Sequence, residues 1–209
     1  VTYVMTCQTF VTNNAVLTIE EGTTIFATPQ ASNSADSKYD TAPALVITRG
    51  AKIMARGTAA KPITMTAVNP DTSSTSLFAR DTTTTTTTLQ TRGKWGGLVI
   101  LGNAPHSLAT TTVVEGITGS GTQGHYGGTD ANDNSGVLSY VRVWHGGAHV
   151  SANNELNGVT FGGVGAGTTV DHCEVAFNAD DGFEFFGGTV NVKYLSVLFV
   201  GDDAFDTDH

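Results

Sequence analysis

Two acidic runs near the C-terminus carry the residue types best suited to chemistry. Asp180-Asp181-Gly182-Phe183-Glu184 is followed 22 residues later by Asp202-Asp203-Ala204-Phe205-Asp206. Each run has carboxylates at positions i, i+1 and i+4 and a phenylalanine at i+3. Carboxylate oxygens are the ligands that hard cations such as Ca²⁺ prefer, and an all-oxygen set disfavours zinc or copper. The sequence therefore predicts a calcium site with the ligands Asp180, Asp181, Glu184, Asp202, Asp203 and Asp206.

The constant offset between the runs indicates a repeat that brings them together. A period of this length with strand-like sequence inside it is typical of a solenoid. In a parallel β-helix, equivalent residues of successive coils lie about 4.8 Å apart. Two unit charges at roughly 5 Å repel by about 3 kcal/mol at an effective dielectric constant of about 20. A bound cation would offset this repulsion; the alternative is that both runs face water and are screened by salt.

Strand geometry predicts which side chains of the runs point outward. Residues i and i+2 of a strand share a face, so Phe183 and Phe185 should enter the core, as should Phe205. The expected result is an exterior patch of four carboxylates, with Asp181 and Asp203 at the turns. The four are Asp180, Glu184, Asp202 and Asp206.

The sequence predicts that strands, rather than helices, position this patch. Helix signals are nearly absent, glycine is abundant with 25 residues, and apolar positions alternate. The pattern L-x-I-x-x-G-x-x-I occurs at 17–25 and again at 45–53, an offset of 28. We interpret the two copies as successive coils, with the polar insertion 28–41 explaining the excess over 22. The prediction is an all-β, right-handed parallel β-helix; an antiparallel sandwich is the alternative.

Long polar loops are expected to interrupt the coils of a single domain spanning 1–209. The insertions lie at about 28–41, 69–92 and 103–134, and the second contains an uninterrupted threonine run, Thr82 to Thr88. That run is either a carrier of hydroxyl-linked glycans or a bare loop. Because the sequence begins at Val1 without an initiator methionine, we expect it to be part of a longer or processed protein.

Composition excludes several classes of partner. With 10 Lys and Arg against 19 Asp and Glu, the net charge is −9, which disfavours nucleic acid and anionic membranes. No apolar stretch is long enough to span a bilayer. Cys7 and Cys173 should lie several coils apart, too far for a disulfide. No Asn-x-Ser/Thr sequon is present.

Histidines and aromatic residues offer weaker candidates. His145 and His149 have a metal-like i, i+4 spacing, but they lie in a glycine-rich loop, so an ordinary loop pair is the expectation. His172 precedes a strand and is expected to be structural. Trp95, Trp144 and Tyr126 could stack on sugar rings, although aromatic residues of a β-helix more often belong to the core.

Three longer motifs resemble a known family. WGGLVILGNAP at 95–105, ELNGVTFGGVG at 155–165 and NADDGFEFFGGT at 178–189 resemble secreted or lipid-anchored bacterial β-helix proteins of the pectin-lyase-like superfamily. The likeness extends from Leu17 to the C-terminus. It implies a parallel β-helix at the cell surface or outside the cell, in a family of largely unknown function.

A second resemblance concerns chemistry. Asn-x-Asp-Asp-Gly followed by an aromatic residue and an acid is similar to the calcium-ligand strand of some β-helix pectate lyases. That likeness implies Ca²⁺ held by both acidic runs, and a lysine from a later coil that abstracts the proton α to a uronate carboxylate. Lys193 begins a strand and cannot be placed beside the acids, so no catalytic residue is assigned.

Three functions remain open from the sequence. The favoured one is an extracellular structural or adhesive module, stiffened by calcium and able to associate with copies of itself into fibres. The alternatives are a calcium-dependent polysaccharide lyase acting on uronates and a non-catalytic glycan-binding module, with an acidic or cell-surface polysaccharide as partner. Two equivalent acidic runs favour a repeated structural ladder over a single active site.

Overall fold

Three parallel sheets form the body of the molecule. The computed structural model describes residues 1–28, 42–68, 92–108, 112–117, 119–151 and 154–208. Sheet A contains β1 (Thr2–Met5), β4 (Thr24–Ala27), β7 (Ile63–Ala67), β12 (Val141–Trp144), β17 (Glu174–Ala176) and β20 (Ser196–Leu198). Sheet B contains β2 (Thr9–Val11), β5 (Leu45–Ile47), β8 (Leu98–Leu101), β15 (Val159–Gly162), β18 (Phe183–Phe186) and β21 (Phe205–Asp208). Sheet C contains β3 (Val16–Ile19), β6 (Lys52–Arg56), β11 (Gly136–Ser139), β16 (Thr169–Asp171) and β19 (Asn191–Lys193).

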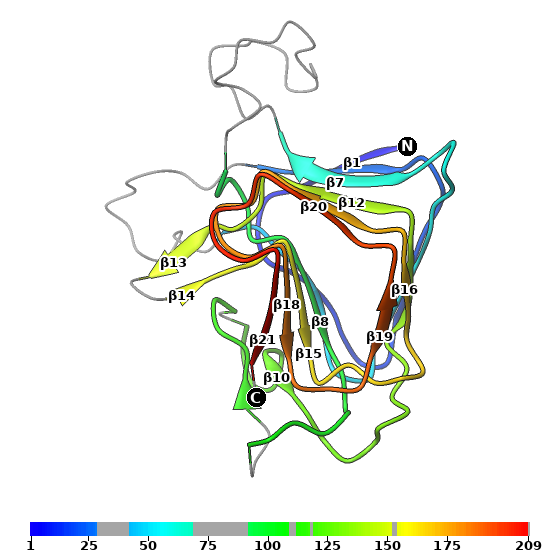
Figure 1. Ribbon diagram of the computed structural model, residues 1–209, viewed down its shortest axis with the longest axis vertical. Helices are drawn as coiled ribbons and strands as arrows, with labels where there is room; N and C mark the ends of the chain where they lie inside the picture. Colours follow the sequence, from blue (N-terminus) through cyan, green and yellow to red (C-terminus); the bar gives the residue numbers. More distant parts are fainter. Residues whose placement is uncertain (29–41, 69–91, 109–111, 118, 152–153, 209) are drawn as a thin grey trace, which may run out of the picture.

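The chain visits sheets A, B and C in that order, coil after coil, and the three sheets enclose one interior (Figure 1). Every neighbouring pair of strands within these sheets is parallel, as in the pairing of β18 with β15 and β21. The predicted parallel β-helix is therefore confirmed, and the antiparallel sandwich is wrong. Two short antiparallel pairs lie outside the coils: β9 (Thr112–Val113) with β10 (His125–Tyr126), and β13 (His149–Ser151) with β14 (Asn154–Glu155).

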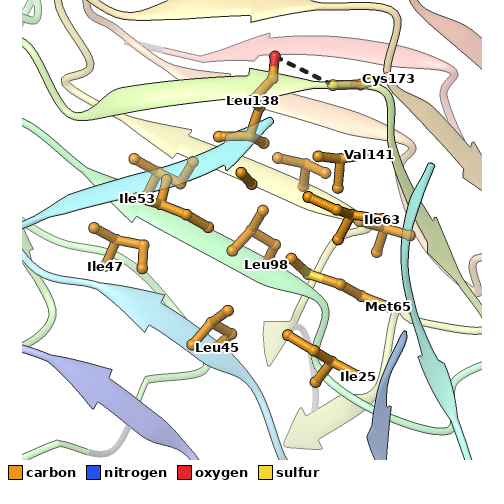
Figure 2. Packing of buried hydrophobic residues seen from close by; sticks show 14 of the residues in the cluster. Ile25, Leu45, Ile47, Ile53, Ile63, Met65, Leu98, Leu138, Val141 and Cys173 are labelled. Carbon is orange, nitrogen blue, oxygen red and sulfur yellow. Dashed lines mark hydrogen bonds between the residues drawn. The ribbon is translucent and has the colours of Figure 1, made fainter. Parts of the chain in front are cut away.

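Alternate residues of the strands fill the interior with aliphatic and aromatic side chains. Ile25, Ile53 and Leu98 come from different sheets and meet in one cluster (Figure 2). Burying each such side chain stabilises the fold by about 1.5–3 kcal/mol. Cys173 lies in this cluster with its thiol toward the carbonyl of Leu138, whereas Cys7 is exposed, and both cysteines are free.

Strand register confirms one of the two sequence repeats and corrects the other. Phe183 pairs with Phe205 and Val175 with Val197, so the offset of 22 is one coil. The copies at 17–25 and 45–53 are not in register, because Leu17 pairs with Ile53 rather than with Leu45. The first copy turns the corner from sheet C to sheet A, and the second turns from B to C. The pattern encodes two strands joined by a glycine turn, and this arrangement fits both corners. The pattern can therefore recur at positions that are not equivalent in successive coils.

Side chains at the corners of sheet A form stacked ladders. Tyr140, His172 and Tyr194 stack with ring centroids 4.5 Å apart, all in left-handed backbone conformation. At the other end of sheet A, Phe177 stacks between His145 and Phe199 at 5.2 and 5.3 Å. His172 thus has the structural place that was expected for it. The ladders end at Tyr194 and Phe199, which are 72% and 63% exposed.

The outer face of sheet B is covered by a second apolar cluster. Val99 and Leu101 point away from the interior and pack with Tyr126 and Leu156, which come from the segments that carry β9–β10 and β13–β14. In Figure 1 these strands lie on the side of β18 and β15 that faces away from sheet C. The outer face of sheet B is therefore partly closed to solvent, and this closure determines the environment of the acidic runs.

Some expected features fall outside the described residues. These are residues 29–41 and 69–91 of the insertions expected at 28–41 and 69–92, including the threonine run at 82–88. The chain between β8 and β11 runs through 102–135 and contributes β9 and β10. Over the described part of the chain, no helix is long and apolar enough to cross a membrane.

Candidate metal centre

The acidic residues gather where sheet A passes into sheet B in the last two coils. Asp180 and Asp181 lie between β17 and β18, and Asp202 and Asp203 occupy the same place one coil later, between β20 and β21. Glu184 and Asp206 pair directly in the ladder between β18 and β21. The 22-residue offset thus stacks the two runs as the sequence predicted.

Two carboxylate triplets share Asp181. In one, oxygens of Asp180, Asp181 and Asp202 lie within 4.8 Å of one another; in the other, oxygens of Asp181, Glu184 and Asp206 do so. Five of the six expected ligands are therefore brought together. The carboxylate of Asp203 belongs to neither triplet, and its backbone N–H donates to Asp181 Oδ1 at 2.8 Å.

The expected exterior patch is wrong in part, because the acids of the earlier run are largely buried. Glu184 points away from the main core as predicted, but only 7% of it is exposed, and Asp181 is 8% exposed. Asp202 and Asp203 of the last coil are exposed. The strand parity was right; the sequence did not reveal that other segments cover this side of sheet B. Phe205 stacks on Phe183 at 5.8 Å as expected, yet it remains 51% exposed at the end of the described coils.

Asn157 binds the carboxylate of Glu184, and Asn157 and Asn178 both hold the backbone of Asp181. Asn157 Nδ2 donates to Glu184 Oε2, and Asn157 Oδ1 accepts the backbone N–H of Asp181 at 3.2 Å. Asn178 Nδ2 donates to the carbonyl of Asp181 at 2.7 Å. Because both amides are buried, they hold the turn before β18 in one geometry.

Burial and like charge raise the pKa values of these acids. Burial is the first cause for Glu184, whose pKa rises to about 8, and nearby Glu115, Asp181 and Asp206 add repulsion. Burial likewise raises the pKa of Asp181 to about 6, against the backbone hydrogen bond from Asp203 that lowers it. The pKa of Asp180 is raised by burial and by Glu155 and Asp202. In the absence of a positive counter-charge, folding therefore brings together carboxyl groups whose protonated form is favoured.

Further acids around the centre were missed from the sequence. The charge of Glu155 raises the pKa of Asp180, and the charge of Glu115 raises the pKa of Glu184. The pKa of Glu115 is itself raised by partial desolvation and by Glu155, Asp180, Asp208 and Asp181. Asn157 was also missed, although a signal existed: Val159 pairs with Phe183, an offset of 24 that places Asn157 one coil below Asp181. Glu115 and Glu155 come from segments outside the coils, so no repeat could locate them.

The other sequence candidates lie elsewhere. His145 is buried against Phe177, whereas His149 is exposed and its Nδ1 lies 2.9 Å from Glu155 Oε1, so the two histidines do not form a metal pair with each other. Lys193 pairs with Asp171 in sheet C, away from the triplets. Trp95 and Tyr126 are buried, and the partly exposed Trp144 donates its indole N–H to Glu174 at 2.7 Å.

Comparison with known proteins agrees with this architecture. A family model described as a pectate-lyase-like beta helix domain matches residues 1–77 and 82–209. The chain therefore belongs to this family. No curated protein and no solved structure matches the chain.

Proposed function

We propose that this chain is an extracellular, non-catalytic β-helix module that Ca²⁺ stiffens at the junction of its last two coils. The observation that carries the proposal is the pair of carboxylate triplets sharing Asp181, with oxygens within 4.8 Å of one another. Ca²⁺ takes six to eight oxygen ligands at about 2.3–2.6 Å, and carboxylates supply one or two oxygens each. A cation in the first triplet would join Asp180 and Asp181 of one coil to Asp202 of the next, and one in the second would join Asp181 and Glu184 to Asp206.

The buried position of the inner acids supports a cation rather than a solvated patch. A carboxylate removed from water costs several kcal/mol unless it is paired or protonated. Thr160 adds a further oxygen: it pairs with Glu184 across the ladder, and its buried hydroxyl has no hydrogen-bond partner among the described residues. Hydroxyl and carboxylate oxygens together suit a hard cation.

The lyase alternative is less well supported. The pectate-lyase resemblance implies a lysine that acts as the base near the substrate. Among the described residues after Asp171, Lys193 is the only lysine, and it pairs with Asp171 in sheet C. Membership of the family settles the fold and leaves the activity to the site, and this site favours holding a cation.

Direct binding tests the cation proposal. We expect calorimetric titration of metal-free protein with CaCl₂ at about pH 7.5 to show saturable binding, with release of protons because Glu184 is largely protonated before binding. Proton release is measured by repeating the titration in buffers of different ionisation enthalpy. Absence of saturable binding up to about 1 mM Ca²⁺ would contradict the proposal.

We also propose that the module associates with copies of itself through its coil ends. Phe199, Phe205 and Leu198 are exposed at the C-terminal end, and Tyr3 and Val4 at the N-terminal end. Wherever no further coil follows such an end, its unpaired strand edges beside apolar side chains favour pairing with another β-coil. The same C-terminal end carries Asp202, Asp203, Asp206 and Asp208, so neutralisation by Ca²⁺ should be needed.

Sedimentation velocity should show this association. Species larger than the monomer should appear at high concentration with Ca²⁺ and disappear with a chelator. Phe199→Glu should abolish them, because it places a charge on the exposed end of an aromatic ladder. Val113→Glu, a matched change at a residue 52% exposed on β9, should leave them unchanged. A monomer at all concentrations with Ca²⁺ present would show that the proposed association is wrong.

A further inference from the structure

A polar cavity lies far along the helix from the acidic centre, at the corner where the first two coils pass from sheet B to sheet C. Its volume is about 470 Å³, within the range of small-ligand sites. The corner turns Thr12–Ala15 and Thr48–Ala51 form one side, each closed by a backbone hydrogen bond. The segment that leads into β10 forms the other side with Thr122 and Gln123.

The wall formed by that segment is fixed to the coils at several points. Gln8 Nε2 donates to the carbonyl of Gly116, and Arg49 Nη1 donates to the carbonyl of Gly127, both at 2.8 Å. Gly119 fits closely against the ring of Phe10, since a Cβ there would lie 2.7 Å from it. These contacts join the segment to both of the first two coils, so the two walls of the cavity are held relative to one another.

The turns themselves are shaped by their sequence. Asn13 and Asn14 both have left-handed backbone, with φ of 57° and 58°, which is the geometry of a type I′ turn. Gly50 in the next coil has φ of 85°, and a Cβ there would lie 2.6 Å from Asn14 Oδ1. Asparagine tolerates this conformation better than most residues, and here it also brings two amides to the edge of the cavity.

The chemistry of the lining identifies the class of ligand. All eight lining residues are polar, and only Arg49 is charged. Amides and hydroxyls each donate and accept hydrogen bonds, as do the hydroxyls of a sugar. An apolar ligand would find little surface to contact, and a polyanion would meet a single cation on a chain of net charge −9.

We propose that this cavity binds an uncharged pyranose residue of a glycan. Asn13, Asn14 and Gln123 hydrogen-bond the sugar hydroxyls, and Arg49 donates to a hydroxyl or ring oxygen. The inference goes beyond the proposed calcium-stiffened role and does not rest on it, because none of the residues that line the cavity belongs to the carboxylate triplets. A module with a saccharide pocket at one end and a cation junction at the other would anchor a surface structure to a neutral polysaccharide.

The test titrates the protein with cellobiose, maltose, lactose, xylobiose and mannobiose, with trigalacturonate as the acidic comparison, all in chelator. We expect at least one neutral disaccharide to bind with a Kd below about 10 mM.

Asn13→Gly combined with Asn14→Gly removes both amides while glycine keeps the left-handed turn. Loss of two hydrogen bonds should weaken binding by roughly tenfold or more. Asn191→Ala removes an exposed amide on β19 and should leave binding within about twofold, because Asn191 lies outside the cavity.

Three results would overturn the proposal. The first is that none of the five neutral disaccharides binds. The second is that binding persists unchanged in the double glycine variant and in Gln123→Ala, which tests the opposite wall should the turn variant not fold. The third is that trigalacturonate binds in preference to every neutral sugar and is displaced by the same substitutions. Because chelator is present throughout, failure here leaves the calcium proposal standing, and failure to bind Ca²⁺ leaves this one standing.

Discussion

In metal-free solution, the protein should lose stability as the pH rises from about 4 to about 8. The folded pKa values of Glu184 and Asp181 are about 8 and about 6, above their ordinary values of 4.5 and 3.8. Between those limits the folded state holds protons that the unfolded state has released. The contribution of these two groups to the free energy of unfolding is therefore fully present below their unfolded pKa values. It is lost as the pH rises through their folded pKa values.

The expected loss is on the order of 3 kcal/mol, since one unit of pKa difference corresponds to about 1.4 kcal/mol and part of the shift is screened. For a chain of this size that lowers the Tm by roughly 6–12 °C. Saturating Ca²⁺ should restore most of the loss at pH 8, because a ligand present at about 100 times its Kd contributes about 2.7 kcal/mol. Calorimetric or fluorescence melting curves at pH 5 and pH 8, with chelator and with Ca²⁺, measure both effects. A metal-free Tm that rises over this interval would contradict the burial of uncompensated carboxylates.

Asp181→Asn should have opposite effects with and without calcium. In chelator at pH 8 the variant should be more stable than the parent by about 1–2 kcal/mol, because it removes a buried charge from among like charges. The asparagine oxygen still accepts the backbone N–H of Asp203, which Asp181 Oδ1 now accepts at 2.8 Å. With Ca²⁺ the variant should lose most of the rise in Tm, because Asp181 belongs to both triplets.

Asp203→Asn provides the matched control. It removes the same charge from the equivalent turn one coil later, yet its carboxylate lies in neither triplet. It should therefore keep most of the Ca²⁺-induced shift. If Asp181→Asn and Asp203→Asn respond alike to Ca²⁺, the effect of calcium is general screening rather than a site centred on Asp181.

Sequence by itself determined the β-helix and the stacking of the two acidic runs. Both follow from local rules that repeat in every coil: alternation places Phe183 and Phe205 inward, and a parallel ladder brings residues one period apart into contact. The same reasoning failed for the copies at 17–25 and 45–53, because a corner motif serves any corner of a three-sided coil. Pairing of Leu17 with Ile53 depends on loop lengths that the motif does not encode.

Only the tertiary structure decided the environment of the candidate site. Whether Glu184 faces water depends on the segments around Glu115 and Leu156, which leave the coils and return over the outer face of sheet B. The cavity near Arg49 likewise arises where the segment before β10 crosses two corner turns. Such placements are set by long-range packing rather than by periodicity. Residue spacing therefore predicted that the two acidic runs meet, although Asp203 stays outside both triplets. The fold determined that they meet in a partly buried place where their charges need a partner.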